Sequence, residues 1–214
     1  MDFKQRKNLI FDLDGTLIDS SEGVVASTNY ALQSMGETIR TPDEIRRFIG
    51  YPLEEMFASF SDKSYNEFLR NFQNKAKEVM AVNTVPIGRA EDVLETLYNR
   101  GYRIGIGTTK IRLHIRGILN KLNWDKYVIG YIGADDVANV KPAPDAFIKA
   151  MAIMDADSSN SVVIGDTIND IIAAKSAGIP TIAVKSIFGG DGELKESDPD
   201  RLIDNLEELL DIFK

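Results

Sequence analysis

The stretch NLIFDLDGTLIDS (residues 8–20) places a short apolar run directly before two aspartates and a glycine. The run Asn8–Phe11 is too short for a helix and shows no alternation of polar and apolar residues, which is typical of a strand buried on both faces. Similar runs lie within residues 102–107, 127–133, 161–164 and 181–184, with helical patterns between them. The sequence therefore predicts an α/β fold in which helices cover a parallel sheet.

The segment of residues 18–85 interrupts this alternation, because only helical patterns occur between Leu17 and Pro86. TPDE (residues 41–44) forms a capping box with proline at the first helical position, and apolar residues recur at helical spacing from Tyr65 to Val79. Such a segment is too long for a simple crossover helix. We expect a core of residues 1–17 and 86–214 and a helical insert of residues 18–85 above the carboxyl ends of the strands, with hinges near residues 18–20 and 83–86.

The composition excludes several kinds of site. The 214 residues include no cysteine, which excludes disulfides, thiolate metal sites and cysteine nucleophiles. His114 is the one histidine, which excludes multi-histidine zinc sites, and we expect it partly exposed on a helix without a catalytic role. The net charge of −8 disfavours nucleic acid and anionic membranes as partners. Because the sequence shows neither a membrane-spanning run nor a signal-peptide pattern, we expect a cytoplasmic protein.

Polar residues follow the predicted strands at the edge where open α/β sheets bind their ligands. Taken one at a time, such residues are common in turns and helix caps. Their coincidence at one edge of the sheet is what predicts a functional site there. The residues concerned are Asp12, Asp14, Thr108, Thr109, Lys110, Lys141, Asp166 and Asp170.

The charges at this edge predict a metal and a phosphoryl group. Four aspartates held close together without a counter-ion would repel one another and raise one another's pKa. A divalent cation with oxygen ligands relieves this repulsion, and Mg²⁺ fits best. The metal together with Lys141 would attract a dianion, and Thr108 would offer a hydroxyl and a backbone N–H to its oxygens.

Asp12 and Asp14 suit the two roles that phosphoryl transfer to a carboxylate requires. Asp12, fixed at the end of a strand, would attack phosphorus and form an aspartyl-phosphate. Asp14, in the loop that enters the insert, would protonate the leaving group and then activate water. Gly15 allows the sharp turn between these residues and the insert.

The motifs FDLDGTLIDS, TTK, KPAP and GDTINDIIAAKSAGI resemble, in this order, the four motifs of the haloacid dehalogenase-like hydrolase superfamily. The helical insert resembles the cap of its phosphoglycolate phosphatase-like branch. The resemblance implies a Rossmann-like core, dependence on Mg²⁺, Asp12 as nucleophile and Asp14 as general acid/base. It further implies Mg²⁺ ligands from Asp12, the Asp14 backbone carbonyl and Asp166, phosphate contacts from Thr108, Thr109 and Lys141, and orientation of the metal-bound water by Asp170.

We expect a phosphatase for a small phosphorylated metabolite such as 2-phosphoglycolate. A sugar phosphomutase resembling β-phosphoglucomutase and an inorganic pyrophosphatase are alternatives on the same scaffold. The large insert disfavours a phospho-aspartate switch of the receiver type, and the complete set of acids disfavours a binding protein without activity. Arg46 and Arg47, which precede Gly50 on a capped helix, are candidates for substrate specificity. The sequence leaves the substrate and the oligomeric state open.

Overall fold

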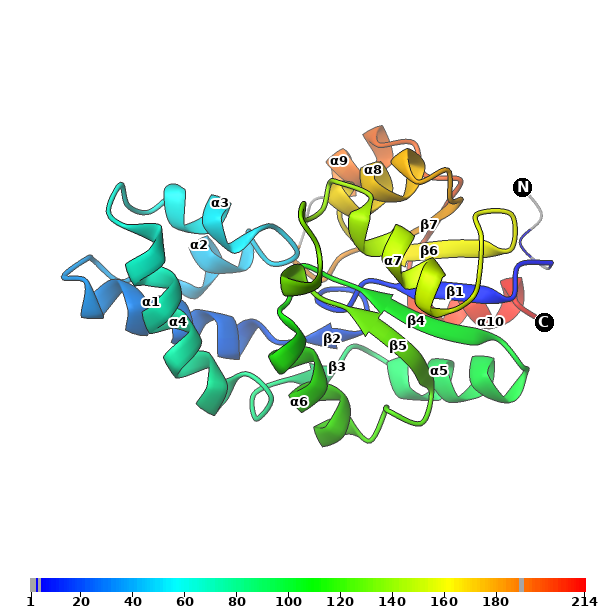
Figure 1. The fold of residues 1–214 in the computed structure, drawn as a ribbon, viewed down its shortest axis with the longest axis horizontal. Helices are drawn as coiled ribbons and strands as arrows, with labels where there is room; N and C mark the ends of the chain where they lie inside the picture. The colour runs from blue at the N-terminus through cyan, green and yellow to red at the C-terminus, as the bar shows by residue number, and fades with distance from the viewer. Residues whose placement is uncertain (1–2, 4, 189–190) are drawn as a thin grey trace.

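The computed structural model describes residues 3, 5–188 and 191–214. Its centre is a six-stranded sheet with the strand order β5-β4-β1-β6-β7-β8, in which all neighbouring strands are parallel (Figure 1). The α/β fold predicted from the sequence is confirmed. The strands are β1 (Asn8–Phe11), β4 (Arg103–Gly107), β5 (Val128–Ile132), β6 (Ser161–Gly165), β7 (Thr181–Val184) and β8 (Arg201–Ile203). The edge strand β8 was not predicted, because a single arginine and two apolar residues make no recognisable run.

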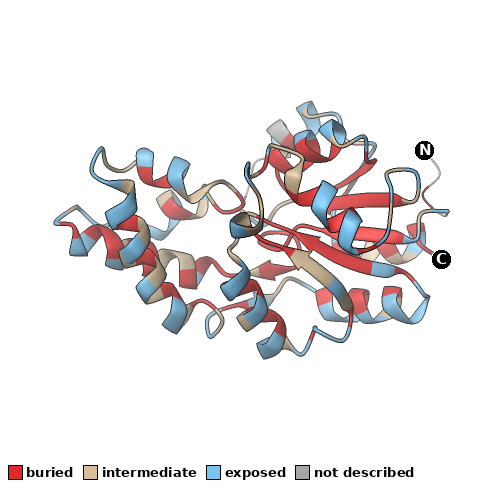
Figure 2. Ribbon diagram, viewed as in Figure 1, coloured by how far each residue is buried: buried red, intermediate tan, exposed pale blue. Residues whose placement is uncertain are grey.

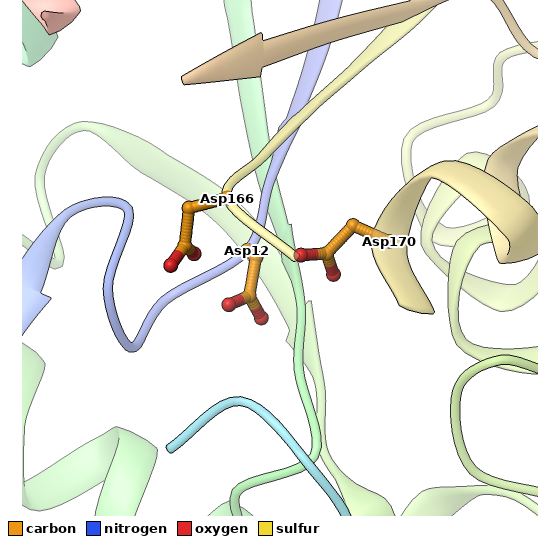
Figure 3. Close-up of side chains that lie close together, drawn as sticks. All are labelled: Asp12, Asp166 and Asp170. Atoms are coloured by element: carbon orange, nitrogen blue, oxygen red, sulfur yellow. The ribbon is translucent and has the colours of Figure 1, made fainter. Parts of the chain in front are cut away.

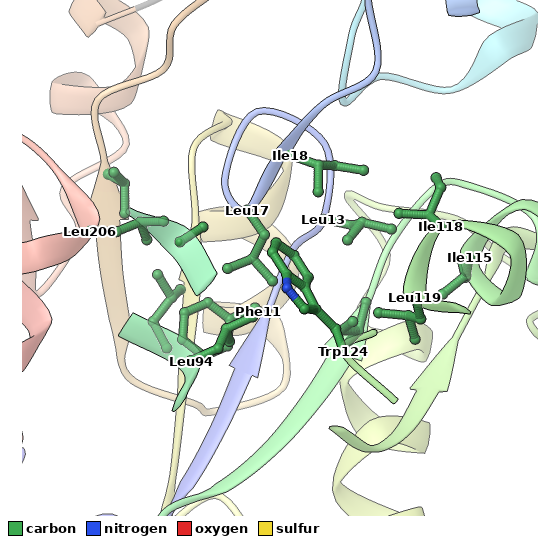
Figure 4. Packing of buried hydrophobic residues seen from close by; sticks show 14 of the residues in the cluster. Phe11, Leu13, Leu17, Ile18, Leu94, Ile115, Ile118, Leu119, Trp124 and Leu206 are labelled. Atoms are coloured by element: carbon green, nitrogen blue, oxygen red, sulfur yellow. The ribbon is translucent and has the colours of Figure 1, made fainter. Parts of the chain in front are cut away.

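Helices cover both faces of the sheet, as buried parallel strands require. The bounds are α5 (Ala90–Asn99), α6 (Arg112–Leu122), α7 (Asp145–Ile153), α8 (Ile168–Ser176), α9 (Asp191–Glu196) and α10 (Leu209–Ile212), with short 3-10 turns at Ala134–Asp136 and Leu206–Glu208. Successive side chains of β1 point to opposite faces: Phe11 packs in the core beneath α5 and α6, whereas Ile10 packs with Phe147 of α7. Figure 4 shows the first of these cores, where Phe11 lies close to Leu94 and Trp124.

The insert consists of the helices α1 (Ser21–Ser34), α2 (Pro42–Arg46), α3 (Leu53–Ala58) and α4 (Tyr65–Val79), which lie beyond the carboxyl ends of the strands (Figure 1). The predicted capping box starts α2: Thr41 Oγ1 accepts a hydrogen bond from the Glu44 N–H at 3.3 Å, and the Glu44 carboxylate accepts one from the Thr41 N–H at 2.8 Å. In α4 the apolar stripe faces inward, and Phe68 stacks on Phe57 of α3 with ring centroids 4.5 Å apart. Buried residues therefore run along one side of each long insert helix (Figure 2).

The two chain crossings between sheet and insert pair with each other as the antiparallel strands β2 (Ile18–Asp19) and β3 (Val85–Pro86). The expectation of helices alone between Leu17 and Pro86 was wrong here, because strands of two residues show no periodicity. Lys121 of α6 donates hydrogen bonds to the carbonyls of Val82 and Thr84 at 2.6 and 2.7 Å. The return crossing is thus tied to a core helix.

Candidate active site

The loop after β1 passes close to the end of β6. The Asp12 N–H donates to the Ile164 carbonyl at 2.8 Å, which continues the ladder between the two strands one residue beyond β1. Gly15 has a φ of +86°, and a Cβ at this position would lie 2.1 Å from Asp166 Oδ2. Only glycine therefore fits this turn, and its small size lets the first loop contact the second.

Asp12, Asp166 and Asp170 meet at this point, as Figure 3 shows. Each is buried, and one carboxylate oxygen from each lies within 4.8 Å of the other two. Asp166 is held by hydrogen bonds from Thr16 Oγ1 at 2.7 Å and from Ser186 Oγ at 2.6 Å. Asp170 accepts from the N–H of Thr167, 3.0 Å away, in a capping box that starts α8. The predicted convergence of these three aspartates is thus present in the structure.

Lys141 is the counter-ion of this cluster. Its Nζ lies 2.6 Å from Asp12 Oδ1 and 2.5 Å from Asp170 Oδ1, and only 1% of its side chain is exposed. Burial alone would lower the pKa of Lys141, but the two carboxylates raise it above its ordinary value. One ammonium group therefore contacts two of the three carboxyl groups, and the acidic groups of the cluster outnumber its cations.

This excess is suited to a divalent cation. Burial raises the pKa of Asp12 to about 7, although Lys141 acts in the opposite direction. Burial also raises the pKa of Asp166 well above its ordinary value, and the charges of Asp12 and Asp170 add to this effect. Asp12 Oδ2 is buried, and no hydrogen-bond partner reaches it from the described residues. An all-oxygen donor set with an unpaired buried carboxylate oxygen fits Mg²⁺.

The Asp14 carboxylate is not part of this group, so the expectation that four aspartates converge was wrong for Asp14, which has partners of its own. Its Oδ1 accepts a hydrogen bond from Ser20 Oγ, and its Oδ2 lies 3.1 Å from Lys110 Nζ. The same ammonium group lies 3.6 Å from Met80 Sδ, at the end of the insert. Lys110 was expected at this edge of the sheet, because it follows the two threonines after β4, but no separate role was predicted for it. Asp14 and Lys110 form a second, separate ion pair beside the cluster.

The two threonines after β4 have different surroundings. The Thr108 N–H donates to the Ile132 carbonyl at 3.0 Å, so it belongs to the sheet. The expectation that this N–H contacts a phosphoryl group was wrong, because the ladder to β5 extends one residue beyond β4. The Thr108 hydroxyl accepts from the Lys110 N–H at 3.3 Å, and Thr109 borders the cavity described next.

A cavity of about 400 Å³ lies between the strand ends and the insert, and we call it the insert cavity. On the core side it is lined by Asp14, Thr109, Lys110, Ile111, His114, Ala134, Asp135 and Val140. On the insert side it is lined by Val24, residues 48–54, Met56, Tyr65, Leu69, Phe72, Gln73 and Met80. The cavity therefore joins Asp14 to the inner surface of the insert.

His114 borders this cavity and is more buried than expected. Partial exposure was expected from the sequence, but only 6% of the residue is exposed, because the insert covers this end of α6. Burial, and to a lesser degree Lys110, lowers the pKa of His114 to about 4. The imidazole is therefore neutral at pH 7.

Arg46 and Arg47 are not among the residues that line the insert cavity. Arg46 forms ion pairs with Glu22 at 2.9 Å and with Asp43 at 3.5 Å, and Arg47 is exposed. The turn that follows them does reach the core, since a Cβ on Gly50 would lie 2.7 Å from Thr167 Cγ2. In this structure the nearby contact with the core is made by the backbone at Gly50, whose φ is +87°.

Buried carboxylates and one lysine at the ends of parallel strands, below a helical insert, define a class of hydrolase built for phosphoryl groups. The model of the haloacid dehalogenase-like hydrolases matches residues 9–184, and the chain belongs to this family. It is an enzyme, a hydrolase of the phosphatase type. Within the described residues, no helix is both long and apolar enough to cross a membrane.

Individual relatives cover nearly the whole chain. Pyrophosphatase PpaX of Anoxybacillus flavithermus (strain DSM 21510 / WK1) is 30% identical over 207 residues, which are 96% of this chain and 95% of that protein. A haloacid dehalogenase-like hydrolase structure from Bacteroides fragilis is 31% identical with a TM-score of 0.89, over 95% of this chain and 99% of the other. A structure from Haemophilus somnus 129PT, described as a predicted phosphoglycolate phosphatase, is 24% identical with a TM-score of 0.84, over 97% and 98% of the two chains. At that identity the likeness shows the shared fold.

Proposed function

We propose that this enzyme is a Mg²⁺-dependent phosphatase of small phosphorylated metabolites and that it works through an aspartyl-phosphate on Asp12. The observation that carries the proposal is the state of the Asp12 carboxylate. Lys141 holds Oδ1 at 2.6 Å, while Oδ2 has no hydrogen-bond partner among the described residues. A fixed carboxylate with one unpaired oxygen is arranged as a nucleophile.

The reaction uses the chain's own groups in two displacements. Asp12 Oδ2 attacks phosphorus, the bond from phosphorus to the ester oxygen breaks, and Asp14 gives a proton to the departing oxygen. Asp14 then takes a proton from water, whose oxygen attacks the phosphorus of the aspartyl-phosphate and releases Asp12 and inorganic phosphate. Lys141 and the hydroxyls of Thr108 and Thr109 hold the phosphoryl oxygens during both steps.

Asp12, Asp166 and the Asp14 backbone carbonyl would hold Mg²⁺, and Asp170 would orient its water ligands. The metal supplies positive charge that stabilises the phosphoryl oxygens. The observation in favour is the excess of carboxylates over ammonium groups in the buried cluster of Asp12, Asp166, Asp170 and Lys141.

The test uses p-nitrophenyl phosphate with Mg²⁺ or with a chelator. Asp12→Asn should abolish release of p-nitrophenol without lowering the melting temperature, whereas the exposed Asp43→Asn should leave the rate unchanged. Chelation should stop the wild-type reaction, and added Mg²⁺ should restore it. Wild-type turnover by the Asp12→Asn protein would show that Asp12 is not the nucleophile.

Inorganic pyrophosphate is a second candidate substrate, because relatives that are 30% identical bear the name pyrophosphatase. The 2-phosphoglycolate expected from the sequence is a third. A sugar phosphomutase would need the phosphoryl group to return to another hydroxyl. Assays of inorganic phosphate with pyrophosphate, 2-phosphoglycolate and β-glucose 1-phosphate separate these reactions. Conversion of the sugar phosphate to an isomer without free phosphate would overturn the phosphatase proposal.

A further inference from the structure

The insert cavity is large enough to hold a molecule beyond the phosphoryl group. Its volume of about 400 Å³ falls in the range of small-molecule sites, roughly 300–1,000 Å³. One end is bordered by Asp14, Thr109 and Lys110, next to the proposed nucleophile, and the other end by α3 and α4. The part of a substrate that leaves with the ester oxygen would occupy this space.

The insert side of the cavity is mostly apolar, with Glu54 and Gln73 as its charged and amide side chains. Phe48, Ile49 and Leu53 line it from the turn before α3, and Leu69 and Phe72 line it from α4. Leu69 and Phe72 are three residues apart, so they lie on one face of α4 and present a continuous hydrocarbon surface. Such a surface binds apolar groups of a ligand more tightly because their contact removes apolar area from water. It offers no hydrogen bond or opposite charge to a charged group, whose burial there costs free energy.

The charges around the cavity oppose a second anionic group on the substrate. Among the described residues that line it, Lys110 is the sole lysine or arginine, and it already pairs with Asp14 at 3.1 Å. Glu54 and Asp135 add two carboxylates to the lining, and the neutral His114 adds no positive charge. Arg46, which would be the natural partner of a carboxylate, pairs instead with Glu22.

We infer that the leaving alcohol of the substrate is an apolar body, aliphatic or aromatic, without a second anionic group. This inference rests on the proposed phosphatase function and narrows its substrate class. It disfavours 2-phosphoglycolate, which carries a carboxylate beside the ester, and pyrophosphate, whose leaving group is itself anionic. The apolar body lies against Leu69 and Phe72, while the phosphoryl group lies at Asp12 Oδ2, the oxygen that Lys141 does not contact.

Rates on a homologous series test the inference with the wild-type enzyme. The kcat/KM for ethyl, butyl and hexyl phosphate should rise about fourfold for each added methylene that the cavity buries. The kcat/KM for hexyl phosphate should be higher than the kcat/KM for 2-phosphoglycolate and for pyrophosphate. A flat series, or a preference for either substrate with an anionic leaving group, would overturn the inference while leaving the phosphatase proposal intact. No phosphate release from any substrate, p-nitrophenyl phosphate included, would instead count against the proposed function and the inference with it.

A charge placed in the cavity provides the second test. Leu69→Lys should lower kcat/KM for hexyl phosphate about tenfold, because the apolar contact is lost, and should raise the ratio of the rate on 2-phosphoglycolate to that on hexyl phosphate. The matched control is Asn74→Lys, which adds the same charge on the exposed face of α4 and should change neither rate. Equal effects of the two variants, or no change of the ratio in Leu69→Lys, would show that the leaving group does not contact this wall.

Discussion

Replacing Lys141 with methionine removes the one cation of the buried cluster and keeps the length of the side chain. The Lys141 ammonium group contacts Asp12 and Asp170 at 2.6 and 2.5 Å, and its side chain is 1% exposed. Removing one partner of a buried ion pair costs about 3–5 kcal/mol, because the remaining charge stays buried without compensation. For a chain of this length, that free energy corresponds to a fall in melting temperature of about 6–20 °C.

The effect of Lys141→Met should depend on pH. The folded-state pKa of Asp12, about 7, lies above its ordinary value of 3.8, so the folded state holds this proton more tightly than the unfolded chain. Its contribution to stability is therefore present at low pH and lost as the pH rises through 7. Without Lys141 the pKa rises further, so the variant should be least stable relative to wild type near pH 8 and most similar to it near pH 5.

The assay is thermal unfolding followed by circular dichroism in a chelator, with Lys175→Met as the matched control. Lys175 forms an exposed ion pair with Asp198 at 3.5 Å, and exposed pairs contribute at most about 1 kcal/mol. Turnover of p-nitrophenyl phosphate should also fall at least about a hundredfold in Lys141→Met, since a donor to the transferring group is lost. Equal melting temperatures for the two variants at pH 8 would refute the argument that Lys141 neutralises buried charge.

Three further outcomes follow from single residues. Gly50→Ala should lower kcat/KM about tenfold to a hundredfold by pressing a methyl group against Thr167, whereas Gly36→Ala, which also has a positive φ but an open surrounding, should leave the rate unchanged. The folded-state pKa of His114 is about 4, below its ordinary 6.5, so this residue should lower the free energy of unfolding of the wild type by about 3 kcal/mol as the pH falls from 7 to 4. Urea unfolding of His114→Gln should not show this decrease. Asp166→Asn should abolish the rise in melting temperature that Mg²⁺ gives the wild type, and an undiminished rise would exclude Asp166 as a ligand.

The sheet was predictable because its strands are buried on both faces. Such strands must be continuous apolar runs, and β1 and β6 are visible in the sequence for this reason alone. The strands that were missed, β8 and the β2–β3 pair, are two or three residues long and depend on a neighbouring strand for their hydrogen bonds. A partner that lies far away in the sequence leaves no periodic signal at the strand itself.

The aspartates of the site were predictable because the carboxyl ends of parallel strands share one edge. Their hydrogen-bond partners were not. The Thr108 N–H is used by the sheet, Lys110 pairs with Asp14, and His114 is buried under the insert. Each of these facts depends on how far a ladder extends or on how the insert sits over the core, which are properties of the packed molecule.

The insert cavity shows why the reaction type at the carboxyl edge of the sheet can be predicted from the sequence, whereas the specificity for the leaving group cannot. The helical stripe of α4 reads as ordinary core, and Phe68 does stack on Phe57 in the interior of the insert. Leu69 and Phe72 of the same stripe line the cavity, although Phe72 also packs against Phe68 in the core. The apolar residues of a helix recur with the same spacing whether they pack in the core or line a ligand cavity. A core-facing residue differs from a cavity-lining residue only in whether another helix fills the space next to it. The chemistry of the substrate's leaving group can therefore be inferred only from the folded structure.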